Sequence, residues 1–186
     1  MKKVKKGDFG YIIYKRKTQS IITVFLLVLS VAVYALGFYS TGSNANLLTY
    51  VAILGCLPMA KFAVNAIMFF KAKGCSLELK DRLNASNVEP TFYDLFFTSF
   101  KKNYQISVAL FKKQTFIMLS EDKDIDVSES EEHVKSVFKN CGYDDCLVKL
   151  YTDSDKFIQR AIELNNLDDE AKDYEFLFDN ILSVSL

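Results

Sequence analysis

Three charged residues of the chain have the types and the spacing that metal-dependent phosphodiester chemistry uses. Glu121 and Lys123 form a Glu-x-Lys pair, and Asp94 lies upstream in an aromatic-rich segment. In such chemistry two carboxylates hold Mg²⁺, while a lysine positions or activates the attacking water. A catalytic interpretation therefore assigns Asp94, Glu121 and Lys123 to one nuclease site.

The charge around this Glu-x-Lys pair argues against a nuclease. Residues 121–186 carry 18 Asp and Glu against 7 Lys and Arg, whereas a phosphodiester substrate requires a basic surface. The run from Glu121 to Glu132 is more typical of a solvated loop and the start of a helix. We therefore expect no nucleic-acid partner, no metal and no cofactor, and we keep the nuclease as the alternative to a role without catalysis.

Other catalytic patterns are missing from the sequence. It has no P-loop, Rossmann glycine fingerprint, G-x-S-x-G elbow or H-E-x-x-H helix, and its 7 glycines occur singly. The histidine His133 follows two glutamates at the start of a predicted helix, where a structural role is expected. The cysteines lack zinc-ligand spacing and are interpreted as small hydrophobic residues: Cys56, Cys75, Cys141 and Cys146.

A second candidate site lies in the apolar segment Leu47–Phe70, which contains Pro58, Lys61 and Asn65 near its middle. Lys61 lies about 15 Å from Lys71 along a helix, which places its ammonium near the bilayer midplane if the segment is one span. Asn65 follows Lys61 by one helical turn and shares its face. Beside that face, a stripe of small residues would let a second helix approach closely: Ala52, Cys56 and Ala60.

The sequence leaves three interpretations of Lys61 and Asn65 open. In the first, the helix breaks near Pro58, and the residues after it lie along the inner interface with their lysines among the headgroups. In the second, the two polar residues form a buried contact with Ser30 and Tyr34 of the first helix, or with another protomer. In the third, they line an ion pathway, which two helices enclose only after oligomerisation.

The elements that carry these residues begin with a membrane hairpin. Ile21–Tyr39 is an uncharged apolar run that matches a ~30 Å hydrocarbon core, and the polar segment Ser40–Asn46 leaves room only for a tight reversal. Lys and Arg flank the pair of spans on both sides, so the positive-inside rule predicts cytoplasmic termini. The sequence thus predicts a multi-pass protein of the cytoplasmic membrane. Residues 1–20 are its basic N-terminus and residues 21–73 its transmembrane hairpin in the lipid bilayer.

Residues 74–186 are predicted to fold as a small cytosolic α+β domain. Helical signals, turn residues and apolar runs follow one another in the order αβββαβαα, which we expect to form a mixed sheet. The aromatic segment Thr91–Ser99 is interpreted as a central strand. Two further strands flank the link Lys112–Gln114 as in a hairpin.

Two helices of this domain have clear boundary signals. A capping box of Ser128 and Glu131 predicts the start of the first, which Gly142 ends. Asp153 or Ser154 is expected to begin the second. The buried face of this second helix is predicted to consist of four residues: Phe157, Ile158, Ala161 and Ile162.

The formal net charge of zero is a balance between two opposite parts. Residues 1–120 hold 16 Lys and Arg against 5 Asp and Glu, and the acidic residues 121–186 offset this excess. Such polarity predicts a basic end at anionic headgroups and an acidic end in water. We expect the acidic helical surface Asp168–Asp179 to meet a basic cytosolic protein. The chain is therefore interpreted as a membrane-anchored interaction or regulatory module that self-associates through its transmembrane helices.

Two resemblances bear on these interpretations. The order αβββαβ with Glu121 and Lys123 is similar to the restriction-endonuclease core and its PD-(D/E)xK motif. However, the first acid of that motif belongs on the second strand, where YQISVALF has none. The segments LLTYVAILGCLPMAKFAVNAIMFF, FYDLFFTSFKKNY and ILSVSL resemble small two-span membrane proteins of Clostridia-type Gram-positive bacteria, over the whole chain. That resemblance implies a bacterial cytoplasmic membrane and no assigned activity.

Overall fold

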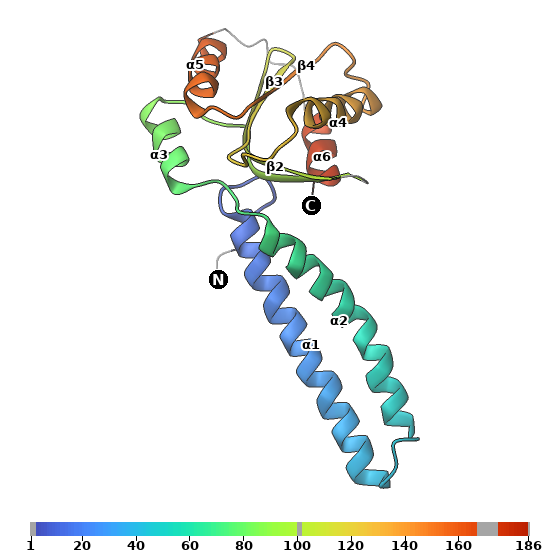
Figure 1. The fold of residues 1–186 in the computed structure, drawn as a ribbon. Coiled ribbons are helices and arrows are strands. Elements are labelled where there is room, and N and C mark those ends of the chain that lie inside the picture. The colour runs from blue at the N-terminus through green and yellow to red at the C-terminus, as the bar shows by residue number, and fades with distance from the viewer. Residues whose placement is uncertain (1–2, 100–101, 167–174, 186) are drawn as a thin grey trace. The chain divides into compact units, whose positions relative to one another are not determined.

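The computed structural model describes residues 3–99, 102–166 and 175–185, and the chain forms two compact units. Ile12–Lys73 make up one unit, and Met1–Tyr11 together with Gly74–Leu186 make up the other. The first contains two long antiparallel helices, and the second contains a four-stranded sheet with shorter helices on both faces (Figure 1). This arrangement agrees with a helical hairpin joined to an α+β domain.

The long helices are α1 (Tyr11–Thr41) and α2 (Leu47–Lys71), and both are long and apolar enough to cross a membrane. Large apolar side chains cover their outer surfaces, among them Phe25, Leu36 and Leu57, each more than 60% exposed. Water would solvate so much contiguous apolar surface at a high cost in free energy. A lipid environment removes this cost.

Helix α2 is continuous through Pro58, so the first of the three interpretations of Lys61, in which the helix breaks near this residue, is wrong. Proline is tolerated inside such helices when neighbouring groups compensate for the missing hydrogen bond. The helix begins at Asn46, whose side chain accepts a hydrogen bond from the Thr49 amide at 2.8 Å. Gly37 permits the close approach at the turn, because an added Cβ would lie 2.8 Å from Leu48 Cβ.

Two contacts define the register of α1 against α2. The Arg16 guanidinium lies 5.7 Å from the centre of the Phe70 ring. Further along, a Cβ added to Gly55 would lie 3.1 Å from Ser30 Oγ. Small residues at these positions let two helices approach closely. The middle of the apolar run in α1 therefore lies opposite Gly55.

The sheet contains four strands in the order β1 (Phe92–Thr98), β2 (Asn103–Lys112), β3 (Thr115–Leu119) and β4 (Leu147–Tyr151). The pairs β1–β2 and β2–β3 are antiparallel, and β3–β4 is parallel, so the prediction of a mixed sheet is confirmed. The link between β2 and β3 is a hairpin, as predicted. Its two central residues have the positive φ angles of a type I′ turn: Lys113 at 47° and Gln114 at 56°.

The prediction that Thr91–Ser99 forms a central strand is wrong, because β1 lies at the edge of the sheet. Its aromatic side chains are nevertheless buried, since other segments cover the open edge. The Tyr93 amide donates to the Gly7 carbonyl at 2.7 Å, and Phe97 forms an isolated antiparallel bridge with Ser185. Covering an edge in this way also blocks pairing with other chains.

Four helices cover the two faces of the sheet (Figure 1). On one face, α3 (Leu77–Ala85) and α5 (Ser154–Asn165) bury Leu79, Leu83 and Phe157. On the other face, α4 (Val127–Asn140) and α6 (Glu175–Val184) bury their own apolar residues, including Phe138 and Ile181. With α3 included, the element order of this unit is αβββαβαα, as predicted.

The start of α4 differs from the prediction. Asp126 is the N-cap and accepts a hydrogen bond from the Glu129 amide at 3.1 Å, so the capping box of Ser128 and Glu131 is wrong. The Glu131 carboxylate instead accepts from the Leu150 amide of the edge strand β4, at 2.8 Å. This tertiary hydrogen bond satisfies a donor that would otherwise be unpaired.

The other helix ends agree better with the predictions made from the sequence. Gly142, with φ of 83°, ends α4 as predicted, and Asp153 is the N-cap of α5. The buried face of α5 ends with Leu164 in place of Ile162, whose side chain is 39% exposed. The predicted N-cap of the last helix, Asp168, lies outside the described residues.

Candidate functional site

Asp94 joins the two chain segments that lead into and out of the helical hairpin. Its Oδ2 accepts a hydrogen bond from the Gly10 amide at 2.8 Å, and its Oδ1 accepts one from the Cys75 amide at 2.6 Å. The side chain is 3% exposed, so both bonds are formed in a medium of low dielectric, where charge-assisted hydrogen bonds are strong. Asp94 thus holds residues 10 and 75 side by side on one carboxylate.

A break in strand alternation places Asp94 in this position. Asp94 has φ of 54°, a left-handed conformation that aspartate adopts more readily than most residues. Side chains on one face of a strand are normally two or four residues apart. Around Asp94 in β1, the residues that pack toward α4 and α6 are three positions apart instead: Phe92 and Leu95. The same spacing occurs around the neighbouring Ser107 in β2, between Ile106 and Ala109.

Glu121 holds the next residue of the same segment. Its Oε2 accepts a hydrogen bond from the Ser76 amide at 2.9 Å, at the start of α3, while its own amide donates to Ser107 Oγ at 3.3 Å. The adjacent amides of Cys75 and Ser76 are therefore bound by two different carboxylates, those of Asp94 and Glu121. A carboxylate at a helix start is also favoured by the helix dipole.

Cys75 lies between these carboxylates. Burial, together with the nearby negative charges of Glu121 and Asp94, raises the pKa of its thiol to about 12, although Lys80 acts in the opposite direction. A thiol with so high a pKa stays protonated at neutral pH and is a poor nucleophile. Cys75 therefore has a packing role, in agreement with the interpretation from the sequence.

The structure gives no support to the nuclease interpretation. Asp94 and Glu121 do lie in one region, but their oxygens accept hydrogen bonds from backbone amides. Lys123 and Glu121 line the same hollow, but Asp94 is not among the residues of that lining. In residues 3–99, 102–166 and 175–185, no three His, Cys, Asp or Glu side chains are grouped as metal ligands.

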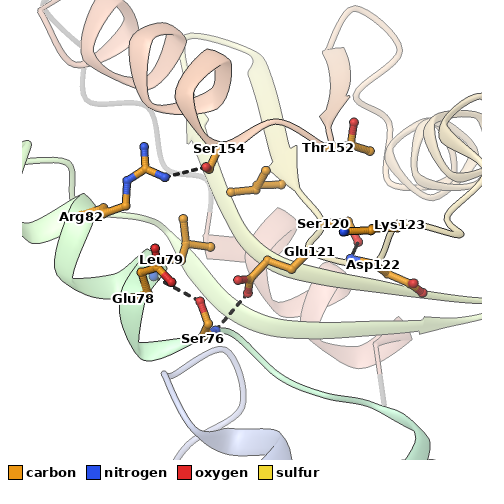
Figure 2. Close-up of a pocket in the computed structure, with 11 residues that line it drawn as sticks. Ser76, Glu78, Leu79, Arg82, Ser120, Glu121, Asp122, Lys123, Thr152 and Ser154 are labelled. Carbon is orange, nitrogen blue, oxygen red and sulfur yellow. Dashed lines mark hydrogen bonds between the residues drawn. The ribbon is translucent and has the colours of Figure 1, made fainter.

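A polar hollow of about 320 Å³ lies at the carboxyl ends of β3 and β4. Its lining comes from the start of α3, the segment after β3 and the segment after β4. Figure 2 shows Glu121 directed toward Ser76, and Arg82 directed toward Ser154, with Arg82 Nη1 donating to Ser154 Oγ at 2.7 Å. Arg82 also forms an ion pair with Asp155.

The topology explains why a hollow forms at this place. After β3 the chain leads into α4, which covers one face of the sheet, and after β4 it leads into α5, which covers the other. The two segments therefore diverge from neighbouring parallel strands. In open α/β sheets this is the position where ligands bind. The Ser120 amide donates to the Tyr151 carbonyl at 3.0 Å and ties the two strand ends together.

The polar residues of α2 are separated by the structure. Lys61 is exposed on the outer surface of the helix pair, and Asn65 is partly buried. Because Gly55 lies opposite Ser30, the register of the two antiparallel helices places Lys61 level with Val24 and Phe25, nearer to the basic end of the apolar run than to its centre. The three small residues of the predicted stripe do not all pack against α1. Ala52 is buried, whereas Cys56 and Ala60 are exposed.

The proposed partners of Lys61 in α1 make other contacts. Ser30 lies against Gly55, and Tyr34 Oη donates to Asn44 Oδ1 at 3.0 Å in the connecting loop. A buried contact between Lys61 and these residues is therefore absent from the described part of the chain. His133 packs its ring against Tyr104, with centroids 5.7 Å apart, which agrees with the structural role expected for it.

The hollow and the Asp94 contacts were not predicted from the sequence as a site. For Asp94 a signal existed, because a charged residue interrupts an otherwise aromatic strand. Comparison of the chain with protein-family models, with curated proteins and with solved structures gave no match.

Proposed function

We propose that the chain is a two-pass protein of the bacterial cytoplasmic membrane that carries a cytosolic interaction or regulatory domain. The observation that supports it most is the attachment of Gly10 and Cys75 to the one carboxylate of Asp94. The two chain segments that connect the α+β unit to the hairpin thus leave this unit next to each other. Such an arrangement suits a hairpin whose two helices enter the same membrane side by side. The exposed apolar surfaces of α1 and α2 support a membrane as their solvent.

The orientation follows from charge. Lys and Arg precede the apolar run of α1 and follow that of α2, whereas the loop that joins the two helices is uncharged. The positive-inside rule then places both termini in the cytoplasm. The bacterial cell membrane itself rests on the resemblance to small two-span proteins of Clostridia-type bacteria.

Cysteine labelling tests this topology. In a cysteine-free background, a membrane-impermeant maleimide should label Ser43→Cys in intact cells, because residue 43 lies in the outer loop. Ser128→Cys, at an exposed position of α4, should be labelled only after lysis. Labelling of residue 128 but not of residue 43 in intact cells would show the inverse orientation. If neither residue reacts before lysis, the chain does not expose its loop outside the cell.

The partner that we propose is a basic cytosolic protein. Residues 121–186 hold 18 acidic residues, and electrostatic complementarity steers and orients such complexes. Part of the acidic surface Asp168–Asp179 lies outside the described residues, but Asp179 is described and exposed on α6. A homo-oligomer through the exposed face of α2, which includes Cys56 and Ala60, is a further part of the proposal.

Charge reversal tests whether the partner binds the surface around Asp179 or responds only to the overall negative charge of the domain. Asp179→Lys should reduce the amount of partner captured from solubilised membranes by about fivefold, which corresponds to roughly 1 kcal/mol. The matched control is Asp144→Lys, at another exposed acid in the loop between α4 and β4. Capture that is unchanged by Asp179→Lys, or reduced equally by both substitutions, would argue against this surface.

A further inference from the structure

The hollow at the carboxyl ends of β3 and β4 presents groups of both charges. Lys123 and Thr152 line it and make no hydrogen bond or ion pair with any other residue that the structure describes. Glu78 and Glu121 also line it, and Figure 2 shows these carboxylates apart from Lys123 and Thr152. A bound molecule would therefore meet a cation, a hydroxyl group and carboxylates within one lining.

The lining excludes several classes of ligand. Leu79 and Leu119 are its apolar members, so it offers little surface for an acyl chain or a steroid. Among the residues that the structure describes, the lining contains no aromatic side chain on which a nucleobase could stack. A free phosphate or a sulfate would bring negative charge close to the carboxylates of Glu78, Glu121 and Asp122. These groups disfavour an anion that carries no positive charge.

We propose that this hollow binds a small zwitterion, specifically a free amino acid. Lys123 and Thr152 hold its α-carboxylate, through the ammonium charge of the lysine and the hydroxyl donor of the threonine. Glu78 and Glu121 hold its α-ammonium. The hollow of about 320 Å³ has room for an amino acid with a side chain and accompanying water. The proposal goes beyond the proposed function and does not depend on the orientation in the membrane.

Thermal unfolding of the full chain in detergent tests the proposal. Each of the twenty L-amino acids is added singly, and inorganic phosphate and adenosine monophosphate are added as comparison probes. At least one amino acid should raise Tm by about 5 °C when present well above its Kd. Its N-acetyl derivative and its carboxamide should each give no shift, because each lacks one of the two charges.

Variants of the hollow provide the control. Lys123→Gln and Glu78→Gln should each abolish the shift without changing Tm in the absence of ligand, since both residues are exposed. Lys135→Gln and Glu132→Gln change exposed residues of α4, on the opposite face of the sheet, and should keep the shift. The proposal is overturned if no amino acid raises Tm, or if Lys123→Gln keeps the full shift. A shift with phosphate or the nucleotide alone also overturns it, and assigns an anion site.

Discussion

Replacing Asp94 by alanine should lower the free energy of unfolding of the α+β unit by about 4 kcal/mol. The substitution leaves the amides of Gly10 and Cys75 without their acceptor, and a hydrogen bond to a charged group contributes about 1.5–3 kcal/mol. Thermal or urea unfolding of the full chain in detergent measures the loss. Trypsin should also cleave faster after Lys73, because the segment that follows it is no longer held.

Two other substitutions of Asp94 separate the effect of the lost hydrogen bonds from the effect of backbone strain. Asp94→Asn keeps one acceptor oxygen and tolerates the positive φ, so it should lose about half as much stability as Asp94→Ala. Asp94→Gly removes both acceptor oxygens, but glycine adopts φ of 54° without strain. Its loss of stability should therefore lie between those of Asp94→Asn and Asp94→Ala. Equal losses for asparagine and alanine, or unchanged cleavage after Lys73, would contradict the role given to this carboxylate. Cleavage after Lys113, in the β2–β3 turn, should not change.

The elements predicted correctly from the sequence are those that local signals define. Apolar patterns and turn residues predicted the order αβββαβαα and the β2–β3 hairpin, and Gly142 predicted the end of α4. These features depend on residues close in sequence, where side-chain chemistry acts directly on the backbone. The two long apolar helices were predicted for the same reason.

The incorrect predictions depend on contacts between distant residues. Glu131 has the spacing of a capping box, but its carboxylate bonds to the Leu150 amide, 19 residues away in the chain. Thr91–Ser99 is as apolar as a central strand because the N-terminal segment and Ser185 cover its edge. Asp94 and Glu121 were grouped by charge, yet their partners are amides that only the folded chain brings near.

The hollow illustrates a further limit. Its residues come from three segments, and they meet only because the chain after β3 and the chain after β4 pass to opposite faces of the sheet. The parallel pairing of β3 and β4 across α4 sets this geometry. A sequence that predicts a helix between two strands does not say which face the next helix will cover. The site therefore follows from topology more than from any motif.

A disulfide between positions 30 and 55 should form almost completely on mild oxidation of the double variant Ser30→Cys, Gly55→Cys. A Cβ added to Gly55 lies 3.1 Å from Ser30 Oγ, and a disulfide places the Cβ of one cysteine about 3 Å from the sulfur of the other. The background carries Cys56→Ala. The matched control pairs Ser30→Cys with Ile53→Cys, since Ile53 is 60% exposed on α2. It should give little intramolecular product.

This cross-link also determines the depth of Lys61. If Gly55 opposes Ser30, the middle of the apolar run, then Lys61 lies ~9 Å from the bilayer centre and about 6 Å from the edge of a ~30 Å hydrocarbon core. An extended lysine side chain reaches the headgroups from that depth. Lys61→Leu should then leave insertion and self-association unchanged. A high yield from positions 30 and 53, with none from 30 and 55, would shift the register and restore the need for a polar partner at Lys61.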